Sequence, residues 1–171
     1  MRIAITDACI FIDLYSLEII AQFFQLNIEI HTSYDVINEL YTHQQKVLKA
    51  FETTGKLIVH NLTDEERTII HQEVYPKSLS ENDKTVIHLA IKFDALLLSS
   101  DKAVRNYAKT KAIDHHGMLW IFDQLIGNNL LHYLVAREKL RELIMTNIIY
   151  QNNPELVREM NKRINQWKTN T

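Results

Sequence analysis

The chain contains few of the residues that punctuate loops or cross-link small folds. Its 171 residues include only 3 Gly, 2 Pro and 1 Cys. A lone cysteine cannot form an internal disulfide, and no secretory leader opens the sequence, so we expect a cytoplasmic protein. No apolar run approaches the roughly 20 residues that cross a bilayer, so we expect no membrane partner. With 46% apolar residues, the chain fits one compact domain with a helical appendage.

An excess of basic charge is missing too. The formal net charge is -2, which argues against nucleic-acid binding by bulk charge alone. The charge is unevenly distributed, however, because residues 132–171 hold 7 Lys and Arg against 4 Asp and Glu. Binding to a partner that carries phosphates therefore stays an open alternative.

Short β-rich runs alternate with helical patterns along most of the chain. Helix starts are indicated at Ser33 and by the capping-box spacings of Thr63 and Ser80. Because short strands separated by helices pair through crossovers, we predict an α/β fold, a three-layer αβα sandwich around a central parallel sheet of about five strands. The expected strands are residues 2–6, 28–32, 57–60 and 95–98, and one near Ile113.

After Gly117 the pattern is helical to the end. We therefore expect a domain over residues 1–131 and a helical extension over 132–171, with a helix that begins at Pro154. This last helix carries an apolar stripe, which we expect to pack on its own domain or on a partner. The stripe consists of Leu156, Val157, Met160, Ile164 and Trp167.

Four acidic residues follow or adjoin the expected strands. Asp7 comes directly after the first strand, and Asp101 comes shortly after the fourth. Asp83 falls in the first turn of the helix before that strand, and Glu39 borders the apolar stripe of the helix after the second. Ligand sites of parallel sheets form beyond the carboxyl ends of the strands. Crowded carboxylates suit Mg²⁺ or Mn²⁺, and such an ion can activate water against a phosphodiester.

Each acid also has a simpler interpretation. Asp83 fits a helix cap as well as a ligand, and Asp101 fits a cap or a pair with Arg105. Glu39 fits a solvated surface acid. Asp7 is the hardest of the four to explain as a simple turn residue. Taken one at a time, these positions would not identify an enzyme.

Five segments together resemble the PIN-domain family. Four of them match its acidic blocks in order, and the fifth matches its closing strand, glycine and helix. The resemblance covers roughly residues 1–130, so it leaves the last 40 or so unexplained. The segments are ITDACIFIDL (5–14), SYDVINEL (33–40), LSENDKTVIHLA (79–90), LLLSSDKAVRNYA (96–108) and IDHHGMLWIFDQLI (113–126).

The resemblance implies a site and an activity. It places the family's acidic quartet on Asp7, Glu39, Asp83 and Asp101, with a supporting hydroxyl at Ser99. It implies a Mg²⁺- or Mn²⁺-dependent ribonuclease, frequently the toxin of a toxin–antitoxin pair. The expected partners are therefore an RNA substrate and an antitoxin protein, with a homodimer as the default assembly. Glu81 rivals Asp83 for the third acid, but the spacing before HLA favours Asp83.

Two other functions remain open beside nuclease activity. One is a PIN-like interaction module that keeps the fold without catalysis. The other is a phosphoacceptor signalling domain, which would want a further acidic pair where the first strand offers only Asp7. Lys102 and Arg105 follow Asp101 on one helix and could hold substrate phosphates, although a solvated helix face is the simpler interpretation.

Histidines and tryptophans near the last strand invite further hypotheses. His115 and His116 could suggest zinc, but no second ligand pair accompanies them. If they lie in a strand, one should face the core and the other solvent. Trp120 and Trp167 could stack on bases, yet their apolar helix positions favour the core for both.

Overall fold

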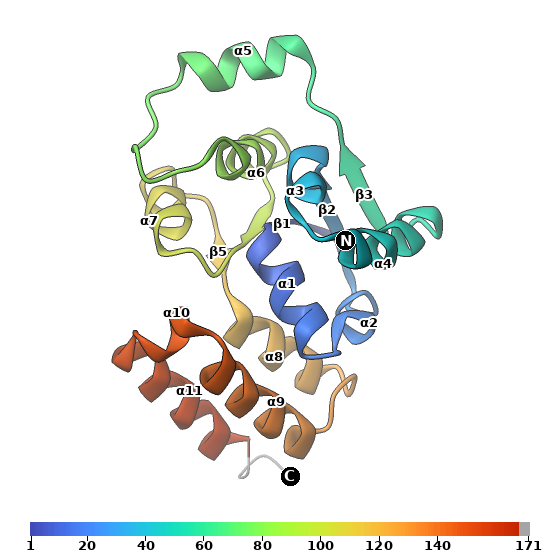
Figure 1. The fold of residues 1–171 in the computed structure, drawn as a ribbon, viewed down its shortest axis with the longest axis vertical. Helices are drawn as coiled ribbons and strands as arrows, with labels where there is room; N and C mark the ends of the chain where they lie inside the picture. Colours follow the sequence, from blue (N-terminus) through green and yellow to red (C-terminus); the bar gives the residue numbers. More distant parts are fainter. Residues whose placement is uncertain (168–171) are drawn as a thin grey trace.

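Five parallel strands form one sheet in the computed structural model, which describes residues 1–167 (Figure 1). The strand order is β3-β2-β1-β4-β5, so β1 lies in the middle of the sheet. Ala4 of β1 is in register with Ile30 of β2 on one side and with Leu96 of β4 on the other. The strands are β1 (Arg2–Thr6), β2 (Ile28–Ser33), β3 (Leu57–His60), β4 (Leu96–Leu98) and β5 (His115–His116).

The last strand begins two residues later than expected. Ala112 adopts a left-handed conformation with φ 56°, and the N–H of Ile113 donates to the carbonyl of Ala108. Ile113 therefore closes the preceding helix and does not enter the sheet. The two-residue strand leaves His115 and His116 both half-buried, so the prediction that one faces the core and the other solvent is wrong.

Helices cover both faces of this sheet. The connections from β1 to β3 run towards one edge, and those from β3 to β5 run towards the other. Because parallel crossovers are right-handed, the first group of helices lies on one face and the second on the opposite face. The first group is α1 (Ala8–Ser16), α2 (Ile20–Phe23), α3 (Tyr34–Glu39) and α4 (Thr42–Thr53), and the second is α5 (Asp64–Gln72), α6 (Glu81–Lys92) and α7 (Lys102–Thr110). The α/β sandwich predicted from sequence is confirmed.

Polar residues placed just before the helices fix where they begin. Ser33 accepts a hydrogen bond from the N–H of Val36 at 3.1 Å, which caps α3. Thr63 and Ser80 each take part in a capping box, as their spacings predicted. These caps satisfy helix N–H groups that would otherwise lack partners.

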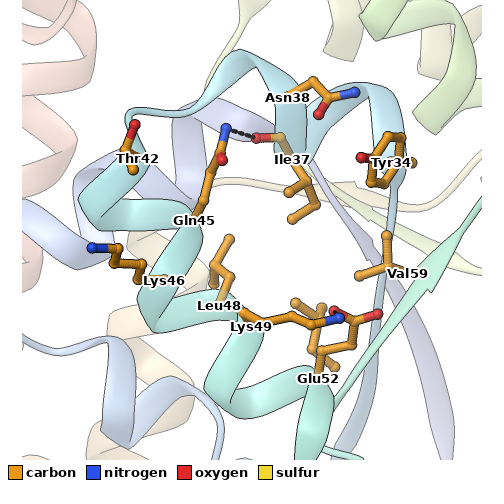
Figure 2. Close-up of a pocket in the computed structure, with 11 residues that line it drawn as sticks. Tyr34, Ile37, Asn38, Thr42, Gln45, Lys46, Leu48, Lys49, Glu52 and Val59 are labelled. Carbon is orange, nitrogen blue, oxygen red and sulfur yellow. Dashed lines mark hydrogen bonds and ion pairs between the residues drawn. The ribbon is translucent and has the colours of Figure 1, made fainter.

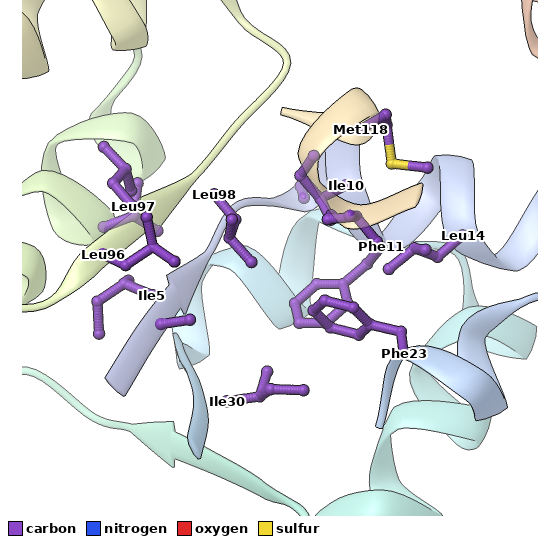
Figure 3. Packing of buried hydrophobic residues seen from close by; sticks show 14 of the residues in the cluster. Ile5, Ile10, Phe11, Leu14, Phe23, Ile30, Leu96, Leu97, Leu98 and Met118 are labelled. Atoms are coloured by element: carbon purple, nitrogen blue, oxygen red, sulfur yellow. The ribbon is translucent and has the colours of Figure 1, made fainter. Parts of the chain in front are cut away.

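The core between the sheet and the first helical face is apolar (Figure 3). Ile30 and Leu98 of the sheet are buried, as are Phe11 of α1 and Phe23 of α2. Burying side chains of this size contributes about 1.5–3 kcal/mol each. This packing holds β1 and α1, and hence Asp7 between them, in fixed positions.

The C-terminal helices pack on their own chain, at the bottom of Figure 1. Met160, Ile164 and Trp167 of the predicted stripe are buried, while Leu156 and Val157 are half-buried. The indole N–H of Trp167 donates to Asp123 of α8 at 3.1 Å. The helices are α8 (Met118–Gly127), α9 (Tyr133–Thr146), α10 (Ile148–Gln151) and α11 (Pro154–Gln166).

Trp120 is only half-buried and stacks on His116, with ring centroids 4.9 Å apart, so the core position is found for Trp167 alone. Within residues 1–167, no helix combines the length and apolarity needed to span a membrane.

Candidate acidic active site

The carboxyl ends of β1 and β4 lie side by side at the point where the strand order reverses direction. Ligand sites of open parallel sheets form at such switch points. Asp7 follows β1 directly, and Asp101 follows β4 by three residues. The N–H of Asp7 donates to the carbonyl of Leu98 at 3.0 Å, which joins the two strand ends.

Asp7 is buried at this junction, with only 4% of its surface exposed. It caps α1 by accepting from the N–H of Ala8 at 2.7 Å, and its other oxygen accepts from Ser99 Oγ at 2.8 Å. The pKa of Asp7 is raised to about 6, because burial, and after it the charge of Asp83, outweigh the lowering effect of its hydrogen bonds. No cationic side chain is among the groups that shift this pKa. A buried acid without a cation is a candidate for function.

Asp83 and Glu39 lie on two helices that approach each other beside this junction. Asp83 Oδ2 accepts from the N–H of Ser80 at 2.7 Å, so the cap interpretation holds for that oxygen. Within the described residues its Oδ1 has no hydrogen bond. Glu39 is exposed and accepts from Asn82 Nδ2 at 3.0 Å, next to Asp83 in the chain. Glu81, the rival of Asp83 for the third acid, is exposed and pairs with Lys84. Asp83 is therefore the acid whose charge reaches Asp7.

Ser99 joins Asp7 to the start of α7. This fully buried serine donates to Asp7 and accepts from the N–H of Asp101 at 3.1 Å. Asp101 caps α7, because its Oδ1 accepts from Ala103 N–H at 2.6 Å and Val104 N–H at 3.1 Å. The side chain of Asp101 is exposed and forms no ion pair with Arg105 within residues 1–167.

The donor set suits a hard divalent cation, because it consists of carboxylate and hydroxyl oxygens. The buried, unneutralised Asp7 in the field of Asp83 is the observation that supports such an ion. As they stand, the described side chains include no group of three or more His, Cys, Asp and Glu that could hold one ion. The structure thus connects Asp7, Ser99 and Asp101 by hydrogen bonds, Asp7 and Asp83 by charge, and Glu39 through Asn82.

Lys102 and Arg105 lie on α7 directly after Asp101. Lys102 is exposed and Arg105 half-buried. A Cβ added to Gly117 would lie 3.5 Å from the carbonyl oxygen of Ser99 and 3.6 Å from Arg105 Nη1. The guanidinium therefore lies close to the backbone of the site.

Sequence analysis missed a second polar contact network behind the acids. Asp13 of α1 is 5% exposed, and it accepts from Tyr150 Oη at 2.9 Å and from Asn147 Nδ2 at 3.0 Å. Tyr150 Oη also lies 2.9 Å from Ser100 Oγ. Burial raises the pKa of Asp13 and that of the Tyr150 phenol. An acid on the otherwise apolar helix IFIDL was the available signal.

Cys9 belongs to the same set of contacts. Its Sγ lies 3.4 Å from Asp7 Oδ2 and accepts from the N–H of Ser100 at 3.2 Å. Burial raises the pKa of this thiol far above its ordinary value, so it stays protonated and acts as a hydrogen-bonding group beside Asp7.

A separate pocket lies under α3 and α4, near the β3 edge of the sheet (Figure 2). Its walls combine apolar side chains such as Ile37 and Val59 with Lys49 and Glu52, which pair with each other at 2.8 Å. None of the four acids lines it, so it is not part of the acidic site.

The fold and the site together define a class, a parallel α/β protein with acids at the switch point of its sheet. A family model described as PIN domain matches residues 3–166. The chain belongs to the PIN-domain family. The match runs through α11, further than the resemblance seen in the sequence, so the family model includes the C-terminal helices.

Solved structures with similar folds come from archaea and a bacterium. A PilT N-terminus domain protein from Sulfolobus solfataricus P2 is 14% identical, with TM-score 0.48 over 73% of this chain and 94% of its own. A domain of a functionally unknown protein from Methanocaldococcus jannaschii is 20% identical, with TM-score 0.49 over 69% and 91%. VapBC2 from Rickettsia felis, bound to a DNA fragment from its promoter, is 16% identical, with TM-score 0.40 over 68% and 98%. No curated protein matches the chain.

Proposed function

We propose that this protein is a metal-dependent endoribonuclease that hydrolyses phosphodiester bonds of RNA. The observation that supports the proposal most strongly is the buried Asp7 carboxylate, which has an acidic neighbour and, among residues 1–167, no cation to neutralise it. Such an arrangement costs stability in an empty site and is explained by a function that needs it. Family membership supports the same activity.

The acids Asp7, Glu39, Asp83 and Asp101 would hold Mg²⁺ or Mn²⁺. A divalent ion held there supplies charge neutralisation at the phosphoryl oxygens and a water of lowered pKa. Ser99 positions Asp7 and the start of α7 through its two hydrogen bonds. Lys102 and Arg105 would bind substrate phosphates, and the packing of Cys9 and Ser99 around Asp7 keeps bulk water from its inner oxygen.

The products of the reaction test this mechanism. We expect RNA cleavage that requires Mg²⁺ or Mn²⁺ and leaves a 5′-phosphate and a 3′-hydroxyl, because water is the proposed nucleophile. End-group analysis of the fragments measures this. A 2′,3′-cyclic phosphate would contradict the mechanism, since it requires attack by the RNA's own hydroxyl.

The variant Asp7→Asn provides the matched test of the site. It keeps the size of the side chain and an oxygen for the Ala8 cap, but it loses the charge. We expect activity to fall by about 10²-fold or more. A folded wild-type protein that shows no cleavage with either metal would favour the alternative, a catalytically silent PIN-like module.

The proposal includes partners and a compartment. We propose a cytoplasmic toxin that acts as a homodimer and is inhibited by an antitoxin protein. Sedimentation of the purified chain tests the dimer. Inhibition of cleavage by the product of a neighbouring gene tests the antitoxin.

A further inference from the structure

A polar groove lies beside the acidic site, between α7 and the junction of α10 and α11. In Figure 1, α10 lies below α7 on the left-hand side. The groove encloses about 760 Å³ and is walled by Lys102, Arg105 and Asn106 of α7 on one side. Asn152 and Arg158 lie on the other side, so the C-terminal helices supply half of it.

The cations of this groove lack acidic partners. Within residues 1–167, Lys102, Arg105 and Arg158 form no ion pair. The other arginines and lysines of α9 and α11 are mostly paired: Arg137, Lys139, Arg141 and Arg163 each contact an acid. The groove contains one acid, Glu155, against three cations. It therefore presents a net positive surface that the fold leaves unneutralised.

Polar groups of residues that line the groove also lack hydrogen-bond partners within residues 1–167. Arg105 Nε is buried and has no hydrogen bond among the described residues. The side-chain amides of Asn106 and Asn152 form none there either. An anionic ligand in the groove would offer hydrogen-bond acceptors to the guanidinium of Arg105 and to the two amides.

The groove adjoins the acidic site through α7. Arg105 lines both this groove and a small cavity walled by Ser100, Gly117 and Tyr150. Lys102 directly follows Asp101, which caps the same helix. A polymer whose phosphate reaches Asp101 therefore has its neighbouring phosphates at the mouth of the groove.

We propose that this groove binds the flanking phosphates of a single-stranded RNA substrate, with Arg158 of α11 as a phosphate-binding residue. The inference rests on the proposed function, and it assigns the C-terminal extension a direct role in substrate binding. Cations and amides suit phosphate oxygens, and the half-exposed Ile149 on the rim offers an apolar surface to base faces. Because phosphates carry no sequence information, this contribution is independent of base sequence.

The test compares two variants of one helix in the Asp7→Asn background, which prevents cleavage. Arg158→Ala removes a groove cation. Lys162→Ala removes an exposed cation one turn further along α11, which forms no ion pair within residues 1–167 and does not line the groove. Fluorescence anisotropy measures binding of a labelled RNA of about 12 nucleotides, in a uridine-only and a mixed sequence, at several salt concentrations.

We expect Arg158→Ala to weaken binding of both RNAs about five- to tenfold and to lower the salt slope by about 0.7. Lys162→Ala should stay within about twofold of the parent. Equal losses in both variants, or none, would overturn the inference. So would equally tight, Arg158-dependent binding of a polyglutamate peptide, which would indicate a groove for an acidic protein segment.

The two proposals fail separately. Wild-type cleavage of RNA together with an unaffected Arg158→Ala variant leaves the nuclease and removes the groove. Arg158-dependent RNA binding by a protein that cleaves nothing leaves the groove and removes the nuclease.

Discussion

Asp7 and Glu66 are acids on opposite helical layers of the same sheet, and their surroundings shift their pKa values in opposite directions. Burial raises the pKa of Asp7 to about 6. Hydrogen bonds lower the pKa of Glu66 to about 2, and the bond from Lys92 has a larger effect than the bond from the backbone N–H of Thr63. Lys92 Nζ lies 2.8 Å from Glu66 Oε1, and His88 Nε2 lies 3.3 Å from the same oxygen.

The difference separates an acid that supports the fold from one that strains it. Glu66 joins α5 to α6 and closes a capping box, so its charge stabilises the native state. Asp7 is ionised only against the cost of burial, and no cation in the described part of the chain offsets that cost. Asp13 lies between these cases, because burial raises its pKa and two hydrogen bonds lower it, with no acidic neighbour among the described residues adding to the rise.

The largest difference should appear in how stability depends on pH. The folded-state pKa of Asp7, about 6, lies above the ordinary aspartate value of 3.8, so its contribution to stability is complete below pH 3.8 and is lost as pH rises through 6. The loss amounts to about 3 kcal/mol. Urea unfolding of the metal-free protein from pH 4 to pH 8 measures it.

Asp7→Asn serves as the matched control for this loss. It should remove most of the decline, and Mg²⁺ or Mn²⁺ should stabilise the wild type above pH 6 more than it stabilises the variant. An unchanged pH profile in Asp7→Asn would show that Asp7 is not the strained group.

Asp13, the intermediate case, predicts a smaller effect on stability. Tyr150→Phe removes the hydroxyl that donates to Asp13 and contacts Ser100, while Asn147 still donates to the other oxygen. We expect a loss of about 1–3 kcal/mol in the free energy of unfolding. Tyr107→Phe removes a hydroxyl bonded to the surface acid Glu73 and should cost less. If the two variants unfold alike, the Asp13 contact is not a stabilising one.

The smallest effect should come from Glu66→Gln. The lowered pKa of Glu66 means that the stabilisation is present above the ordinary glutamate value of 4.5 and is lost as pH falls towards 2. Lys92 is almost half exposed, so we expect about 1 kcal/mol or less. Thermal melts at pH 7 and pH 3 should differ less for the variant than for wild type. If the substitution lowers stability relative to wild type more at pH 3 than at pH 7, the predicted direction of the pH dependence is wrong.

Local rules predicted the sheet and the helix starts well. Ser33, Thr63 and Ser80 cap the helices that their spacing indicated, and four strands fall where short β-rich runs occur. The last strand begins later than predicted because a left-handed turn at Ala112 closes α7. The φ angle of an alanine cannot be inferred from composition.

The acidic residues were found because strand ends meet at one edge of a parallel sheet. The contacts of Asp13 could not be predicted, because they depend on how a distant helix packs. Arg158 was missed for the same reason, since the pattern of α11 shows its apolar stripe but not which polar residues face α7. The convergence of all four acids on one ion stays a prediction.

The hydrogen bond between Tyr150 and Asp13 joins residues 137 positions apart in the chain. During synthesis the strand β1 and its acid Asp7 emerge before all the other elements of the site, whereas the tyrosine that reaches Asp13 and Ser100 emerges only after α9. A nascent chain that stops before α10 has the acids of the site but lacks this support and one wall of the groove. Translation through α10 and α11 therefore separates an incomplete site from a finished one, and a product that stops before α10 would carry the acids without the complete surface around them.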